Sequence, residues 1–124
     1  NIIKILIILK MKEIKEEEVI FRVGSNAEDN WKLLQNSKQN WIWFHLDKLS
    51  SPYVVITESI KTLKNKKCPM SLNYYLNFGA ELCKENSKYK KLKVSVTWTE
   101  VKNVSKGTKV GSAIIKGKRN IIVL

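Results

Sequence analysis

The chain of 124 residues has few of the side chains on which metal sites depend. It contains one histidine, His45, and two cysteines, Cys68 and Cys83. These residues cannot assemble the four ligands of an ordinary zinc site, so we expect neither a metal nor a cofactor. The two cysteines could form a disulfide, but two buried free thiols fit them better, which favours a reducing, cytoplasmic compartment.

The parts of a nucleophilic active site are also missing. No Gly-x-Ser-x-Gly elbow accompanies His45. Cys83 falls on the apolar stripe of a predicted helix, and Cys68 lies in a lysine-rich loop. The segment 107–111 has glycines at both ends, but it lacks the Gly-Lys-Ser ending and the following helix of a phosphate-binding P-loop. We therefore expect a protein that is not an enzyme.

Long hydrophobic runs are scarce as well. The isoleucine-rich segment 2–9 is bracketed by Lys4 and Lys10. It is shorter than the roughly 20 apolar residues that span a bilayer, and no small-residue cleavage site follows it. The run suits a buried strand, and no membrane span is expected. The first residue is not methionine, which is compatible with a fragment of a longer chain.

Arginine is rare in a chain that is otherwise strongly basic. The net charge is +12 and the pI is about 9.8, yet only Arg22 and Arg119 are arginine. Residues 84–124 contain 11 basic and 2 acidic residues, which is +9 of the +12. This excess favours a polyanionic partner, although lysines can also serve solubility alone. Lysines act as point charges, so contact with a nucleic-acid backbone fits them better than reading of bases.

The periodicity predicts one α+β domain over residues 1–124, with two helices and a mainly antiparallel sheet. One helix covers 27–36 and is capped by Asn26. The other is a long amphipathic helix over 70–88, packed on the sheet, and Gly79 within it indicates close packing. Strands are predicted at residues 1–9, 19–23, 41–46, 53–57, 92–99, 101–104, 112–115 and 121–124.

The connections between these elements follow from their composition. The first two strands pair as a hairpin across a polar, acidic connection at 13–18, and 61–69 forms a charged loop. The last strands form a closing hairpin. In the strand 92–99, alternation places Val94, Val96 and Trp98 inward, and Thr97 and Thr99 outward.

The segment Trp41–Leu46 concentrates two tryptophans, a phenylalanine and the histidine. On a strand, Ile42 and Phe44 share one face with Leu46, whereas the other face carries Trp41, Trp43 and His45. Two interpretations are open. The second face either meets a ligand, or it is covered by another layer of the protein.

The order of several motifs resembles the NFACT-R domain from about residue 19 to 124. The specific part is Trp43-Phe44-His45 followed by Asp47-Lys48-Leu49-Ser50-Ser51. The other motifs are Gly24-Ser25-Asn26 with Asn30, the helix around Ala80, Val101-Lys102-Asn103-Val104, Lys106-Gly107 and Gly111.

The resemblance implies an RNA-binding module of proteins that attend stalled large ribosomal subunits and recruit tRNA, or of a stand-alone branch with a coiled-coil tail. The chain departs from the family pattern at three positions. Ser25 replaces a basic residue, Trp31 an acidic residue and Tyr53 a second histidine, which excludes a two-histidine site. The residues that carry over as ligand-facing are Asn26, Trp43, His45 and Lys48.

We therefore expect a non-catalytic domain that binds structured RNA, either tRNA or rRNA. Stacking or hydrogen bonds would come from Trp43, His45 and Trp31. Lysines on loop tips would attract the phosphate backbone, which we favour over a merely solvated rim. This basic set consists of Lys102, Lys106, Lys109, Lys116, Lys118 and Arg119. The alternatives are DNA binding, and a protein-interaction module that docks on a ribosome-associated partner through the Trp41/Trp43 face.

Overall fold

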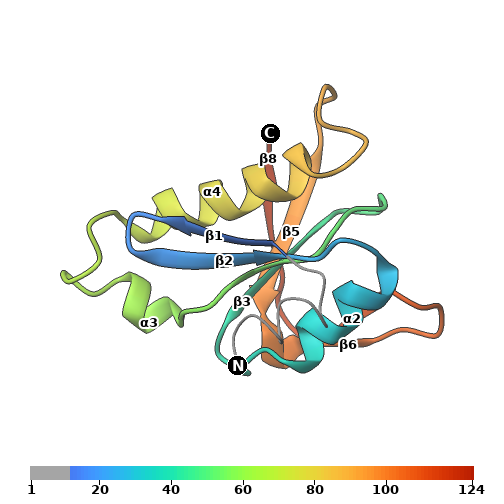
Figure 1. Cartoon of the computed structure of the whole chain (residues 1–124), viewed down its shortest axis with the longest axis horizontal. Helices are drawn as coiled ribbons and strands as arrows, with labels where there is room; N and C mark the ends of the chain where they lie inside the picture. The colour runs from blue at the N-terminus through green and yellow to red at the C-terminus, as the bar shows by residue number, and fades with distance from the viewer. Residues whose placement is uncertain (1–11) are drawn as a thin grey trace.

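The computed structural model describes residues 12–124. These residues form an α+β fold on an antiparallel six-stranded sheet with the order β1-β2-β4-β3-β5-β8, and β6 and β7 form a separate two-stranded sheet (Figure 1). The strands are β1 (Lys12–Glu16), β2 (Val19–Val23), β3 (Ile42–Leu46), β4 (Val54–Ile56), β5 (Ser95–Glu100), β6 (Val104–Lys106), β7 (Ala113–Ile115) and β8 (Asn120–Val123). The helices are α2 (Ala27–Gln35), α3 (Ile60–Leu63), α4 (Leu72–Glu85) and the 3₁₀ turn η1 (Val101–Asn103).

Helix α4 covers one face of the sheet, as the sequence predicted (Figure 1). Ser71 caps its N-terminus by accepting a hydrogen bond from the backbone N–H of Tyr74 at 3.1 Å. A Cβ placed on Gly79 would lie 2.5 Å from Cζ of the fully buried Phe44, so only glycine lets the helix approach β3 this closely. The first core lies between α4 and the sheet. It includes Val19, Phe21, Val23, Ile42, Phe44, Leu46, Val54, Ile56, Tyr75, Ala80, Cys83 and Val96.

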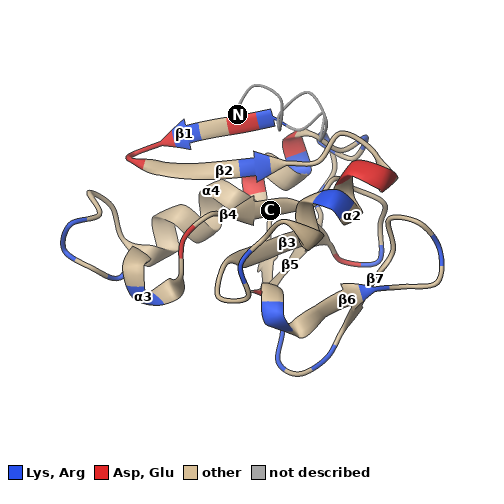
Figure 2. Ribbon diagram, turned by 60° about the horizontal axis from the view of Figure 1, so that its bottom comes forward, with Lys and Arg blue, Asp and Glu red and all other residues tan. Residues whose placement is uncertain are grey.

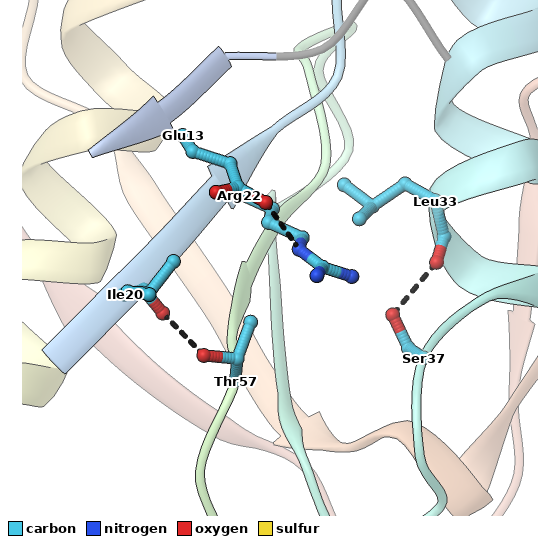
Figure 3. Close-up of polar contacts among 6 residues, drawn as sticks. All are labelled: Glu13, Ile20, Arg22, Leu33, Ser37 and Thr57. Carbon is cyan, nitrogen blue, oxygen red and sulfur yellow. Dashed lines mark hydrogen bonds and ion pairs between the residues drawn. The ribbon is translucent and has the colours of Figure 1, made fainter. Parts of the chain in front are cut away.

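The opposite face of the sheet is covered by α2 and the β6–β7 hairpin (Figure 1). A second core lies there and consists of Leu33, Leu34, Trp43, Tyr53, Val55 and Val101. Arg22 closes one side of this core. Its guanidinium contacts Glu13 of β1 at 3.1 Å and lies 5.3 Å from the ring centre of Trp41 (Figure 3 shows the ion pair). Strands β3 and β4 are therefore buried on both faces.

The hairpin at the N-terminal edge differs from the prediction. Residues 1–9, the expected partner of β2, lie outside the described residues. The partner observed is β1, in the segment that the sequence assigned to a polar connection. Glu17 and Glu18 have φ values of 47° and 68°, as a tight two-residue hairpin turn requires. Ile14 is the one apolar residue of β1, so its sequence lacks the usual signal of a strand.

Three other expectations are corrected. The predicted loop 61–69 begins within α3, whose N-cap is Ser59. Thr97 and Thr99 of β5 are both 2% exposed, because the hairpin layer covers the face that was expected to meet solvent. The chain does not close as a hairpin of its last two strands, since β8 pairs with β5 and β7 pairs with β6.

The two cysteines are free thiols, as expected. Cys68 is half-buried and Cys83 is buried. Burial raises the pKa of Cys83 to about 11, so this side chain stays protonated at neutral pH. Within residues 12–124, no helix has both the length and the apolar character that crossing a membrane demands.

Replacing Gly79 with alanine tests the close packing of α4. In an exposed helix this change stabilises a protein by about 1 kcal/mol. Here we expect a loss of about 1–3 kcal/mol in the free energy of unfolding, because the new methyl group overlaps the Phe44 ring. Denaturant unfolding measures the change. The exposed Asn77 of the same helix is the control, since Asn77→Ala should be neutral or slightly stabilising. A Gly79→Ala protein as stable as the wild type would contradict the packing argument.

Candidate nucleic-acid interface

His45 lies near the end of β3 and is held by two aromatic side chains. Its ring is parallel to that of Trp43, with an interplanar angle of 3° and 5.8 Å between ring centres. The Tyr53 ring meets it edge-on at 5.5 Å. Nδ1 of His45 lies 2.7 Å from the carbonyl oxygen of Leu46. Burial lowers the pKa of His45 below its usual value of 6.5, so the imidazole is neutral at pH 7.

Two cavities meet at His45. The larger has a volume of about 620 Å³, which is within the usual range of ligand sites. Among residues 12–124, its lining includes polar side chains, the apolar Leu49, Pro52 and Val110, and Lys88 and Lys109, and it contains no acidic residue. Its walls come from the residues before and at the start of α2, from the β3–β4 connection, from the chain after α4 and from the β6–β7 loop. The polar lining residues are Ser25, Asn26, Asn30, His45, Ser50, Ser51, Asn86, Ser87 and Ser112.

The smaller cavity has a volume of about 280 Å³ and shares His45, Leu49 and Ser112 with the larger one. Its charged residues are Asp47, Lys48 and Arg119. Arg119 Nη1 lies 3.6 Å from Asp47 Oδ1, and Arg119 is half exposed, so its guanidinium remains accessible. Each cavity therefore contains accessible cations, and the neutral imidazole lines both cavities.

Tyr53 of the second core and Trp31, which packs against that core, hold the β6–β7 loop against the site. Tyr53 donates a hydrogen bond from its hydroxyl to the carbonyl of Gly111 at 2.7 Å. Trp31 donates from Nε1 to the carbonyl of Ser112 at 2.9 Å. Gly111 has a φ of +85°, and a Cβ there would lie 2.6 Å from that of Ala27. These contacts bring Lys109, 64 residues beyond His45 in the sequence, to the wall of the same cavity.

The start of α2 is built by the residues of the Gly-Ser-Asn motif. Asn26 Oδ1 accepts a hydrogen bond from the backbone N–H of Asp29 at 2.9 Å, as the predicted N-cap requires. Ser25 donates from its hydroxyl to the Asp29 carboxylate. Asn30 is 5% exposed, and its Oδ1 accepts a hydrogen bond from the Tyr53 N–H at 2.9 Å. This motif fixes the shape of the larger cavity.

The structure brings six of the predicted site residues together around the cavities. They are Asn26, Trp43, His45, Lys48, Lys109 and Arg119. Lys102, Lys106, Lys116 and Lys118 line neither cavity, although Figure 2 shows basic residues on the neighbouring loops around β6 and β7.

The structure corrects the expectation that Trp43 stacks on a base, and the role of Trp31 stays a prediction. Trp43 is 1% exposed and packs in the second core, so it offers no free face to a base. Its Nε1 has no hydrogen-bond partner within the described residues. Trp31 is half-buried, and Lys106 Nζ lies 4.9 Å from its ring centre. Of the two interpretations of the strand 41–46, the structure supports the one in which another layer covers the tryptophan face.

Sequence reasoning missed the contribution of the chain that follows α4. Asn86, Ser87 and Lys88 line the larger cavity opposite the β6–β7 loop. The lysine-rich run beginning at Lys88 was the available signal, but nothing in the sequence placed it beside His45. Asp47 was also missed as the partner of Arg119.

The stability of the protein should report the protonation of His45. It is the only histidine, so it dominates titration between about pH 5.5 and 7.5. Its pKa is lower in the folded state than the unfolded value, so the unfolded state binds more protons as the pH falls. We expect the free energy of unfolding to be highest above the unfolded pKa and to decrease as the pH falls through this window. Urea unfolding of the wild type and of His45→Asn measures the effect, and equal pH dependence in both would contradict it.

Comparison with known proteins identifies the family. The sequence model described as "NFACT protein RNA binding domain" matches residues 8–122. No curated protein sequence matches the chain. Among solved structures, the C-terminal part of the fibronectin/fibrinogen-binding protein from Streptococcus suis is similar, with a TM-score of 0.74 and 24% sequence identity. That match covers 92% of this chain and 44% of the other, and at this identity it establishes the fold alone. The chain belongs to the family of NFACT RNA-binding domains.

Proposed function

We propose that the protein binds structured RNA, a tRNA or rRNA, at the two cavities around His45 without catalysing a reaction. The family gives the general class of ligand. The observation that carries the assignment to this site is the lining of the larger cavity. Within the described part of the chain, this lining combines two lysines with hydroxyl and amide groups and contains no acidic residue. Such a lining attracts phosphates and hydrogen-bonds to sugars.

The contacts available at the site favour the sugar-phosphate backbone over the bases. Lys88 and Lys109 in the larger cavity, and Lys48 and Arg119 in the smaller, are cations that can approach phosphates. Trp43 is buried, and the half-buried Trp31 has Lys106 Nζ 4.9 Å from its ring centre, so neither indole is a fully open stacking platform. Affinity should therefore come mainly from electrostatic contacts and should depend strongly on salt.

The cellular setting is the one that the resemblance implies. We propose that the RNA is bound during translation or the rescue of stalled ribosomes, in the cytoplasm. The chain spans less than half of the matched solved structure. The proposal therefore concerns RNA binding by this domain.

Docking of a protein partner is the competing function. That hypothesis placed a hot spot on the Trp41/Trp43 face. In the structure Trp43 is buried, and half-buried Trp41 carries Arg22 over its ring. Little apolar surface from the two tryptophans is left for a partner, so the observations favour RNA.

Salt-dependent binding of tRNA tests the proposal. We expect log affinity to fall steeply with log salt, and Lys109→Ala to weaken binding and flatten the slope by about 0.7 to 1. Fluorescence anisotropy across a salt series measures both quantities. Competition with duplex DNA separates RNA binding from general attraction of nucleic acids.

The control removes the same charge at the far end of the molecule. Lys66 is exposed in the loop between α3 and α4, which lies at the opposite end of the long axis from the β6–β7 loop (Figure 1). Lys66→Ala should change affinity and slope much less than Lys109→Ala. Undetectable binding at low salt, or an affinity that does not change with salt concentration, would refute the electrostatic proposal. Equal effects of the two variants would refute the location of the site.

A further inference from the structure

The protonation of the His45 ring follows from its hydrogen bond. Nδ1 lies 2.7 Å from the carbonyl oxygen of Leu46, and a carbonyl oxygen can only accept. The proton of the neutral ring is therefore on Nδ1, which leaves Nε2 as a hydrogen-bond acceptor. No group within residues 12–124 hydrogen-bonds to Nε2, and Nε2 is not among their buried unpaired atoms. The accessible nitrogen is thus an acceptor that requires a donor from the ligand.

The orientation of this acceptor is held by three contacts. The Trp43 ring packs parallel to the imidazole, the Tyr53 ring meets it edge-on, and the hydrogen bond from Nδ1 to the Leu46 carbonyl favours this orientation of the ring. Tyr53 is fully buried and its pKa is raised to about 12 by burial, so it remains an uncharged support. A hydrogen bond to a preorganised acceptor avoids the entropy cost of ordering the side chain.

We propose that Nε2 of His45 accepts a hydrogen bond from a ribose 2′-hydroxyl and thereby makes the site selective for RNA over DNA. This inference rests on the proposed function, because it assigns the feature of RNA that the same site recognises. The chemical groups that line the two cavities support this assignment of Nε2. His45 lines both cavities, and each cavity also has cations on its wall, so a ribose hydroxyl and the phosphates of the same strand find their partners at one site.

A base is a less suitable donor for Nε2. Reading of an unpaired base usually combines hydrogen bonds with stacking on an aromatic or guanidinium plane. Trp43 is in the core, Lys106 Nζ lies 4.9 Å from the ring centre of Trp31, and the Arg119 guanidinium is paired with Asp47. A ribose hydroxyl needs no such platform, and it is the group that distinguishes RNA from DNA at a given site.

The test compares ligands that differ only at the 2′ position. A tRNA stem-loop is prepared as RNA and in 2′-fluoro form, which keeps the A-form geometry but has no O–H donor. We expect the wild type to bind the RNA about tenfold more tightly, the effect of one well-placed hydrogen bond of about 1.4 kcal/mol. His45→Phe keeps an aromatic ring beside Trp43 and removes the acceptor. This variant should bind both ligands with similar affinity.

A charge variant separates this inference from the proposed function. Lys109→Ala should weaken binding of both ligands by the same factor and leave their ratio unchanged. Equal affinities of the wild type for the two ligands, or an unchanged ratio in His45→Phe, would overturn the role of His45 while RNA binding stands. Failure of the wild type to bind either ligand would overturn both.

Nitrogen NMR of the single imidazole gives a second measurement that does not depend on a variant folding. In the wild type we expect Nδ1 to be protonated and Nε2 to be an unprotonated acceptor. The Nε2 resonance should move on addition of the RNA stem-loop and should stay unchanged with the 2′-fluoro stem-loop under saturating conditions. A protonated Nε2 in the free protein, or equal shifts with both ligands, would overturn the assignment.

Discussion

The site depends on the burial of β3 and β4 on both faces. An antiparallel sheet with one covered face would leave Trp43 and Tyr53 in water. Here α2 and the β6–β7 hairpin cover that face, and both side chains are 1% exposed or less. The apolar area of two large aromatic residues is worth several kcal/mol of burial. The same layer leaves His45 only partly covered, at the point where the cavities meet.

The layer formed by α2 and the β6–β7 hairpin therefore has two functions. Its apolar residues stabilise the fold, and its loops position polar and charged groups from distant parts of the sequence. The hydrogen bonds from Tyr53 to Gly111 and from Trp31 to Ser112 join the second core to the loop that carries Lys109. Two of the three departures from the family pattern, Trp31 and Tyr53, are the residues that make these bonds. These two residues set the position of the loop that carries Lys109 at the candidate site.

Much of the fold could be predicted because its elements carry local signals. The Asn26 cap, the amphipathic stripe of α4 and the narrow space at Gly79 are each visible within a few residues, and the structure confirms them. The burial of Trp43 could not be predicted, because alternation identifies two faces of a strand but not the layer that covers the second. The burial of Thr97 and Thr99 escaped prediction for the same reason. Strand β1 escaped because its stability comes from tertiary contacts of α4, in which Tyr74 bonds to Glu16 and Tyr75 to the Glu17 carbonyl.

The sequence indicated which kinds of side chain the candidate site contains, but it did not indicate which individual residues line it. His45 and Lys48 lie near one another in the sequence, whereas Lys109, Arg119 and Lys88 reach the cavities through sheet pairing and loop packing. Among the predicted lysines, the total charge of the tail could not show which ones face the ligand, because every lysine contributes equally to it. The distinction matters physically. Lysines attract phosphates over long distances but impose little geometry on the contact. A fixed neutral imidazole imposes the geometry of one hydrogen bond but exerts no long-range attraction. Under the proposed function, a site that combines the two gathers a polyanion from solution and discriminates at one hydroxyl group.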